Sequence, residues 1–271
     1  MMRGAVLVTG AASGIGRHLV SAWSAGGERI VAADLSVAGL DAARLHEGWR
    51  SDRVATVALD VTDPAAWPRA WDEGAAQVGP IDRLVNNAGV LAPDWVTALA
   101  DADIHRQIDV NVKGVIFGTR EAARRFVPLR AGHIVNIGSL ASLAAVPGLS
   151  LYVASKFAVR GFTLSAAAEL AKSDVAVSLI MPDAVQTPML DLQRNRAEAA
   201  LTFSGGRALT SADVRQAIER AFATKQLELA FPSGRARLAR FVNLFPAISR
   251  LVEPLVTRTG RKHQAASRRK P

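Results

Sequence analysis

Seven short apolar runs alternate with helical patterns as far as about residue 231, and this alternation constrains the fold more than any other feature. The runs are rich in Val, Ile and Ala, and several are apolar at consecutive positions, as in strands buried on both faces of a parallel sheet. They read AVLVT, RIVAAD, VATVA, DRLVNNAG, GHIVNIGS, VAVSLIMP and LELAFP. Helix-length segments such as 101–126 and 151–172 lie between them. This order predicts a doubly wound α/β domain with a seven-stranded parallel sheet.

The composition excludes several classes of function. The chain has no cysteine, so it has no disulfide and no catalytic thiol. Its five histidines show no ligand-like spacing, and we expect no metal site. The first residues enter a strand-like run at once, which leaves no room for a signal peptide. Residues 134–155 are uncharged, but Asn136, Pro147 and several Gly and Ser favour a strand, a loop and a helix start over a membrane span. We expect a cytoplasmic protein.

The net charge of +9 lies in one segment. Residues 235–271 contain ten Lys or Arg residues and one Glu, so they hold the whole excess, and the first 234 residues are balanced. No linker, repeat or low-complexity block precedes this segment. We therefore expect one domain over residues 1–234, followed by a basic amphipathic C-terminal extension over residues 235–271.

The extension has two interpretations. Its apolar residues recur at spacings of 3 and 4, as on one face of a helix. They are Leu238, Phe241, Phe245, Ile248, Val252 and Leu255, flanked by Arg235, Arg237, Arg240, Arg250 and Arg258. Pro246 and Pro254 are expected to break or kink this helix into short pieces. The pattern is typical of a contact with an anionic membrane surface. It equally fits a helix packed on the body or on a partner subunit. Nucleic acid is not expected, because the segment contains no recognition module.

A glycine-rich turn follows the first predicted strand. In VLVTGAASGIGRHLV, Gly10, Gly14 and Gly16 lie between that strand and an amphipathic helix. Glycines there allow a tight turn, and the helix N-terminus attracts a pyrophosphate. The second strand ends at Asp34, 18 residues beyond Gly16. A carboxylate at this place accepts hydrogen bonds from an adenosine ribose and repels a 2′-phosphate. The alternative is that Asp34 caps the helix that follows.

Five motifs together resemble the classical short-chain dehydrogenase/reductase family. They are TGAASGIG, NNAG at 86–89, Asn111, Ser139 and YVASK, in order and with suitable spacing. The resemblance implies a Rossmann-like domain, a nicotinamide cofactor and the interconversion of an alcohol and a carbonyl compound. It also implies a homodimer or homotetramer, and a catalytic set of Asn111, Ser139, Tyr152 and Lys156.

Tyr152 is the only tyrosine of the chain, and Lys156 follows one helical turn later. A free tyrosine has a pKa of about 10, so it needs a nearby positive charge to act as a base at neutral pH. Lys156 and an oxidised nicotinamide would supply that charge, and Tyr152 would be the general acid/base. By resemblance, Ser139 holds the substrate oxygen and Asn111 anchors a water that links Lys156 to solvent. Taken singly, all four residues also have ordinary structural interpretations.

The resemblance places the cofactor along the chain. The expected cofactor-binding residues are Gly10, Ser13, Gly14, Ile15, Gly16, Asp34, Asp60, Val61, Asn87, Ala88, Gly89, Tyr152, Lys156, Pro182 and Thr187. Asp34 favours NAD over NADP, and Ser13 stands in the glycine loop where a basic residue would be expected for NADP. The expected function is an NAD-dependent oxidoreductase. The alternatives are an NADPH-dependent ketoreductase and a non-catalytic dinucleotide-binding scaffold docked by the basic tail.

The segment after the sixth strand departs from the family pattern. Where the family commonly has Pro-Gly, this chain has Pro182-Asp183. The letters DAVQ favour a capping box, with Asp183 as N-cap and Gln186 at the third helical position. The alternative is that Asp183 projects toward the substrate.

Residues 189–210 occupy the place of the family's variable substrate lid. Its apolar residues are Met189, Leu190, Leu192, Leu201 and Phe203. Such a lining favours a lipophilic alcohol or ketone over a sugar or a charged acid.

Overall fold

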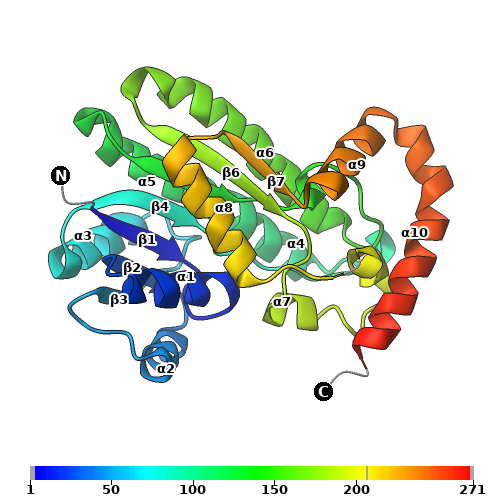
Figure 1. Cartoon of the computed structure of the whole chain (residues 1–271), viewed down its shortest axis with the longest axis horizontal. Helices are drawn as coiled ribbons and strands as arrows, with labels where there is room; N and C mark the ends of the chain where they lie inside the picture. The colour runs from blue at the N-terminus through cyan, green and yellow to red at the C-terminus, as the bar shows by residue number, and fades with distance from the viewer. Residues whose placement is uncertain (1–3, 206, 269–271) are drawn as a thin grey trace.

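Seven parallel strands form one sheet in the order β3-β2-β1-β4-β5-β6-β7 (Figure 1). The computed structural model of the protein describes residues 4–205 and 207–268, apart from the side chains of residues 246–253. The strands are β1 (Ala5–Thr9), β2 (Ile30–Asp34), β3 (Val54–Ala58), β4 (Ile81–Asn86), β5 (His133–Ile137), β6 (Ala176–Pro182) and β7 (Glu228–Phe231). The predicted doubly wound α/β domain is therefore confirmed.

Helices cover both faces of the sheet. They are α1 (Gly14–Ala25), α2 (Val37–Glu47), α3 (Ala66–Val78), α4 (Asp101–Ile108), α5 (Gly114–Leu129), α6 (Ser150–Leu170), α7 (Pro188–Asp191), α8 (Ser211–Thr224), α9 (Ser233–Leu244) and α10 (Pro246–Ser267). Shorter turns are η1 (Val96–Ala98), the π-helical η2 (Asp109–Lys113), η3 (Leu140–Ser142), η4 (Ala171–Ser173) and η5 (Ala197–Ser204).

The core has two layers, one on each face of the sheet. Val6 and Val8 of β1 pack with α1, α2 and α8, and the alternate residues Ala5 and Leu7 pack with α3 and α5. This division follows from the alternation of side chains along a strand. β1 lies between β2 and β4, so the strand order reverses there. In open α/β sheets, ligands bind at such a point, beyond the carboxyl ends of the strands.

The segment 101–126 differs from one continuous helix. It contains α4 and α5 joined by the π-helical turn η2, which includes Asn111. A π-helical turn is an insertion in the helical hydrogen-bond ladder that commonly occurs at functional sites. Here it turns the amide of Asn111 toward the loop after β4, where it bonds Val90.

The C-terminal extension forms two helices at the end of the molecule opposite the N-terminus (Figure 1). The apolar stripe is divided at Pro246, which begins α10, whereas Pro254 lies inside α10 and does not end it. An interior proline costs about 3 kcal/mol, and packing of the following turns against η5 offsets this cost. The side chains of Ile248, Arg250 and Val252 lie outside the described residues. None of the helices in the described part is long and apolar enough to cross a membrane.

Candidate active site

A cavity of about 1130 Å³ opens at the carboxyl ends of the strands. Of the predicted catalytic and cofactor-binding residues, fifteen line it: Gly10, Ser13, Gly14, Ile15, Asp34, Asp60, Val61, Asn87, Ala88, Gly89, Ser139, Tyr152, Lys156, Pro182 and Thr187. Gly16 and Asn111 lie behind this lining. The fold thus brings together residues from seven segments of the chain. Most of them lie at strand ends at one edge of the sheet, whereas Tyr152 and Lys156 come from α6.

The glycine-rich turn fits close to the strand ends. Gly14 has a φ of +53°, which favours glycine, and a side chain there would lie 3.3 Å from the methyl group of Thr187. A side chain at Gly16 would collide with the carbonyl oxygen of Gly10, so glycine lets α1 approach the turn. The first amides of α1 have no acceptor within the helix and lie beside the cavity. This cradle fits the phosphate groups of a dinucleotide.

Asp34 lies on the cavity wall next to the glycine-rich turn. Its carboxylate accepts hydrogen bonds from the backbone N–H groups of Ala12 and Ser36, both at 2.9 Å. The hydroxyl of Ser36 caps α2 by accepting from Gly39, so Ser36 and not Asp34 is the N-cap. Asp34 is therefore held in place beside the glycine turn with its carboxylate on the cavity wall, as the ribose interpretation requires.

The loops after β3 and β4 are fixed by hydrogen bonds to neighbouring backbone. Asp60 accepts from the N–H and the hydroxyl of Thr62 at 2.9 and 2.7 Å. The amide of Asn87 donates to the carbonyl of Thr9 at 2.9 Å, and the N–H of Ala88 donates to the hydroxyl of Thr9 at 3.0 Å. These bonds hold the first turns after β1 and β4 side by side.

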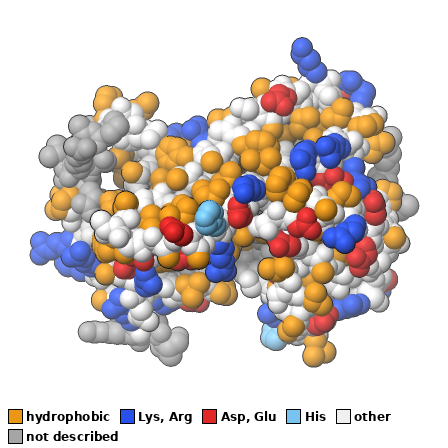
Figure 2. Space-filling view, turned by 180° about the vertical axis from the view of Figure 1, so that it is seen from behind, with side chains coloured by type: hydrophobic (Ala, Val, Ile, Leu, Met, Phe, Trp, Pro, Cys, Tyr) orange, Lys and Arg blue, Asp and Glu red, His pale blue; other side chains and the backbone are white. Residues whose placement is uncertain are grey.

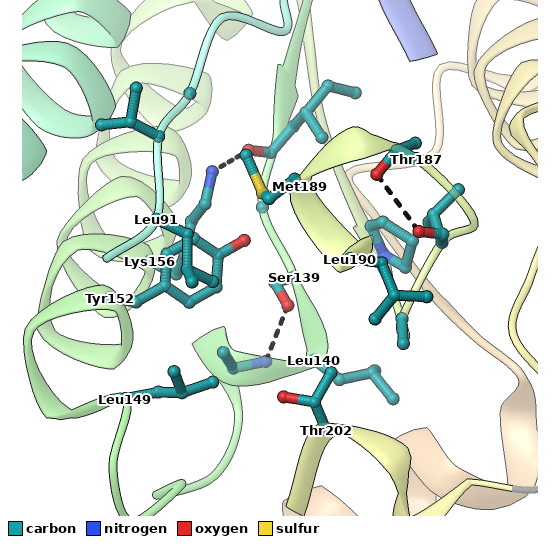
Figure 3. Close-up of a pocket in the computed structure, with 18 of the residues that line it drawn as sticks. Leu91, Ser139, Leu140, Leu149, Tyr152, Lys156, Thr187, Met189, Leu190 and Thr202 are labelled. Carbon is teal, nitrogen blue, oxygen red and sulfur yellow. Dashed lines mark hydrogen bonds between the residues drawn. The ribbon is translucent and has the colours of Figure 1, made fainter. Parts of the chain in front are cut away.

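Three polar side chains meet in the inner half of the cavity (Figure 3). Lys156 is buried, and its Nζ donates to the carbonyl of Ile137 at 2.9 Å. Tyr152 is half-buried, and its hydroxyl points into the same space as the hydroxyl of Ser139. The Oγ of Ser139 accepts from the N–H of Ala141 at 3.1 Å, so its own hydrogen is free to be donated elsewhere. Ser139 is thus both a cap of η3 and a donor facing the cavity.

Burial shifts the two titrating groups in opposite directions. It raises the pKa of Tyr152 to about 12, an effect that the Ser139 side chain partly opposes, and it lowers the pKa of Lys156 to about 8. Without a ligand, Tyr152 is therefore a neutral hydroxyl that can donate a proton. To accept one, it needs positive charge close by, from the Lys156 ammonium and from a bound group.

Asn111 is placed differently from the other three members of the set. Its Oδ1 accepts from the N–H of Val90 at 2.8 Å, and its Nδ2 donates to the Val90 carbonyl at 2.9 Å and to the Ser155 hydroxyl at 3.1 Å. The residue is fully buried. These bonds tie the loop after β4 to α6, next to Lys156.

The expected capping box at Asp183 is wrong. Gln186 and Ala184 pair with Leu209 in a short extended bridge, so residues 184–186 are not helical, and α7 begins only at Pro188. The Asp183 carboxylate instead forms an ion pair with Arg235 of α9. Both residues line the cavity, so the departure from the family pattern places a charge pair at its edge.

Sequence reasoning missed the contribution of the C-terminal helices to this cavity. Its outer half is lined by Met189, Leu190 and Leu201 of the predicted lid. The predicted Leu192, which is 67% exposed, and the predicted Phe203 do not line it. Apolar residues after β4 and β5, such as Leu91, Val146 and Leu149, line the cavity as well. The helices α9 and α10 add a further apolar wall of Leu238, Ala239, Phe241, Val242 and Val256. The apolar stripe of the extension indicated a helix with one apolar face. The sequence did not indicate that this face contributes to the cavity wall.

Comparisons with known proteins agree with this geometry. The family profile described as short chain dehydrogenase matches residues 4–198. A 3-alpha-(or 20-beta)-hydroxysteroid dehydrogenase of Mycobacterium tuberculosis (strain ATCC 25618 / H37Rv) is 38% identical over 186 residues, which cover 68% of this chain and 70% of the relative. An L-2,3-butanediol dehydrogenase of Corynebacterium glutamicum is 40% identical over 187 residues, covering 68% and 72%. A short chain dehydrogenase/reductase from Burkholderia phymatum, solved in complex with NAD, superposes with a TM-score of 0.80 at 27% identity, covering 91% of this chain and 95% of that one.

Proposed function

Because this chain belongs to the short-chain dehydrogenase/reductase family and is an oxidoreductase acting on CH–OH groups, we propose that it interconverts a hydrophobic secondary alcohol and its carbonyl compound with NAD. One observation carries the proposal. Ser139, Tyr152 and Lys156 meet at the inner end of the same cavity that has Asp34 and the glycine turn at its other end. Such an arrangement can hold a dinucleotide and an alcohol oxygen at once.

The proposed chemistry assigns one role to each side chain. When bound, the nicotinamide supplies the hydride acceptor or donor. Ser139 donates a hydrogen bond to the substrate oxygen, and Tyr152 gives or takes the proton at that oxygen. Lys156 stabilises the phenolate form of Tyr152 and contacts the cofactor ribose. Asn111 acts as a positioning residue, because its two bonds to Val90 fix the loop that faces Lys156.

The residues around the cofactor cradle support the choice of NAD. Asp34, Leu35, Ser36 and Asp60 form the adenosine end of the lining. A 2′-phosphate would meet two carboxylates there and no basic side chain of the described lining. Arg17, the nearest candidate in sequence, is paired with Glu47 at 2.7 Å. We therefore propose that the cofactor-binding residues predicted from the sequence bind NAD. Gly16 contributes by letting α1 approach the glycine-rich turn closely. An NADPH-dependent ketoreductase is the alternative.

The outer half of the cavity supports a lipophilic substrate. Its wall includes aliphatic and aromatic side chains of the lid, of α9 and of α10, with Gln193, Thr202 and the Asp183–Arg235 pair among its polar members. Apolar walls of this extent favour ring systems or long chains over small polyols. The named relatives act on both kinds, a hydroxysteroid and a butanediol. We propose that this chain takes the bulkier kind.

The proposed organisation is a dehydrogenase domain over residues 1–234, extended by residues 235–271, in a cytoplasmic homodimer or homotetramer. The subunits would pair through α5 and α6, the two long helices that flank β5. Val127 and Leu129 at the end of α5 are exposed by 36% and 71%, which fits an apolar contact there. Light scattering of the purified protein tests this assembly.

We also propose that the extension makes a peripheral contact with anionic lipid. Five large apolar side chains are exposed on α9, α10 and the residue that joins them: Leu238, Phe241, Leu244, Phe245 and Leu255. Figure 2 shows apolar and basic side chains close together at this end of the molecule, at the left of the view. The exposed basic residues of the described extension are Arg237, Arg240, Arg258, Arg261, Lys262 and Arg268. Leu238 and Phe241 also line the cavity, so a lipophilic substrate would enter from the lipid side.

A spectrophotometric screen tests the proposed reaction. The purified protein is supplied with NAD or NADP and a panel of secondary alcohols, from 2-butanol to a hydroxysteroid, and the reduced-nicotinamide absorbance is followed. We expect turnover with NAD and a higher kcat/KM for the bulky alcohols. Turnover only with NADP, or a preference for the smallest alcohols, would contradict the proposal.

A further inference from the structure

One face of α10 lies directly on η5, the 3₁₀-helical part of the lid (Figure 1). Gln264 is only 3% exposed, and its Nε2 donates to two lid carbonyls, those of Gln193 at 2.9 Å and Arg196 at 2.8 Å. A buried side-chain amide that satisfies two carbonyls at once fixes the relative position of two segments, because losing it leaves both acceptors unpaired.

The two backbones also touch. A side chain at Gly260 would collide with the carbonyl oxygen of Ala200, so only glycine lets α10 approach this closely. One turn later, the imidazole Nδ1 of His263 lies 3.1 Å from the carbonyl oxygen of Phe203. The contact between α10 and η5 is thus made mostly to backbone atoms of the lid, which makes it sensitive to the position of the lid rather than to its side chains.

The lid is held from its other side as well. A side chain at Gly148 would collide with the carbonyl of Glu198, and Arg196 donates to the carbonyl of Pro93 at 2.6 Å. Arg196 also lies 3.6 Å from the carboxylate of Asp94. The lid therefore lies between two active-site loops on one side and α10 on the other.

The inner surface of the lid reaches the cavity through Gln193. Its Oε1 accepts from the hydroxyl of Thr202 at 2.9 Å, and its Nε2 donates to the carbonyl of Met189 at 3.0 Å. Gln193, Thr202 and Met189 all line the cavity. A hydrogen-bond chain consequently runs from Gln264 on α10 through Gln193 to the substrate wall.

We infer that α10 fixes the lid of the substrate pocket, with Gln264 as the positioning residue and Gly260 as the point of close approach. The C-terminal extension then determines the size of the outer pocket and the selectivity for bulky substrates. The selectivity part of this inference rests on the proposed function, whereas the contact between α10 and the lid does not. Small alcohols, which reach only Ser139 and Tyr152, are expected to be insensitive to it.

The first test compares Gln264→Met with Lys262→Met in the full-length protein. Methionine fills the volume of glutamine but donates no hydrogen bond, and Lys262 is exposed on the same helix. Hydrogen–deuterium exchange of residues 193–204 should become faster, on the order of tenfold, in Gln264→Met only. KM for the best bulky alcohol should rise by a similar factor, while kcat/KM for 2-butanol and the affinity for NAD stay within about twofold.

The second test compares Gly260→Ala with Thr259→Ala. Both changes favour the helix, but only the first adds a Cβ against the lid. We expect faster lid exchange and a higher KM for the bulky alcohol in Gly260→Ala alone. Unchanged lid exchange in both Gln264→Met and Gly260→Ala would overturn the inference, and so would equal KM changes for bulky and small alcohols. If the wild type turns over no alcohol, the proposed function fails, and the exchange comparison still decides whether α10 fixes the lid.

Discussion

The Nζ of Lys156 lies 5.6 Å from the centre of the Tyr152 ring, with no acidic side chain acting on the pKa of either residue. Burial lowers the pKa of the lysine to about 8 and raises that of the tyrosine to about 12. The folded chain therefore keeps an ammonium group in an unfavourable place, beside the hydroxyl whose ionised form it can stabilise. This relationship leads to the first two predictions.

Tyr152→Phe should abolish most turnover and leave cofactor binding intact. The substitution keeps the ring and removes only the group that exchanges a proton with the substrate oxygen, so kcat should fall by about 10²-fold or more. Steady-state kinetics with the best alcohol and NAD titration by fluorescence measure the two quantities. A variant that turns over at the wild-type rate would show that Tyr152 is not the proton donor.

Lys156→Met should stabilise the cofactor-free enzyme at neutral pH. A pKa near 8 in the folded state, against 10.5 in the unfolded chain, corresponds to a cost of about 3 kcal/mol for keeping the lysine charged. The Ile137 carbonyl loses its donor, which offsets part of the gain.

The pH dependence of the free energy of unfolding separates the cost of burying a charged Lys156 from the loss of its hydrogen bond to the Ile137 carbonyl. Below pH 8 the folded wild type carries the full cost. Between pH 8 and 10.5 the unfolded chain binds the proton and the folded chain does not, so wild-type stability rises with pH. The stability difference between variant and wild type should therefore shrink by about 2–3 kcal/mol from pH 7 to pH 10. Urea denaturation at these two pH values measures it, and a difference independent of pH would contradict the burial of a charged Lys156.

Asp34→Ala should change the preference between cofactors. Wild type is expected to bind NAD more tightly than NADP. Removing the carboxylate should weaken NAD and strengthen NADP on the order of tenfold, because a like charge no longer faces the 2′-phosphate. Asp41→Ala, an exposed carboxylate on α2, is the matched control for a general change in charge. Tighter binding of NADP than NAD by the wild type would rule out the assignment of Asp34.

Leu244→Asp should weaken the proposed contact with anionic lipid. Leu244 is 72% exposed on α9 and does not line the cavity, so the variant should keep its activity toward soluble alcohols. Inserted Leu and Phe contribute a salt-insensitive part of binding, and each nearby Lys or Arg contributes about 1 kcal/mol that salt weakens. Co-sedimentation with anionic vesicles should fall roughly tenfold.

The matched control for this variant is Leu45→Asp, which changes a leucine 88% exposed on α2, far from the extension (Figure 1). It should bind vesicles like wild type. The lipid contact would be contradicted if wild type bound neutral and anionic vesicles equally, or if both variants lost vesicle binding to the same extent. The exposed face of α9 would then be assigned to a protein partner instead.

Local patterns in the sequence predict the strands, the glycine turn and the Tyr152–Lys156 pair. These features depend on local rules: side-chain alternation in strands, the conformations open to glycine, and the one-turn spacing of two residues on a helix. The position of Asp34 also follows from them, since it ends a strand next to the glycine turn. Most of the predicted catalytic and cofactor-binding residues line one cavity because parallel strands all end at the same edge of a sheet.

Which residues surround the substrate depends on contacts between segments far apart in the sequence. Asp183 pairs with Arg235 rather than capping a helix, because Leu209 holds residues 184–186 extended. Gln264 bonds the carbonyl of Gln193, 71 residues away in the chain. The apolar stripe of the extension predicts one apolar face of a helix. An amphipathic pattern indicates that such a face is buried, but it does not indicate against which surface. Which surface covers it depends on long-range packing, and that packing places α9 and α10 on the lid and the cavity.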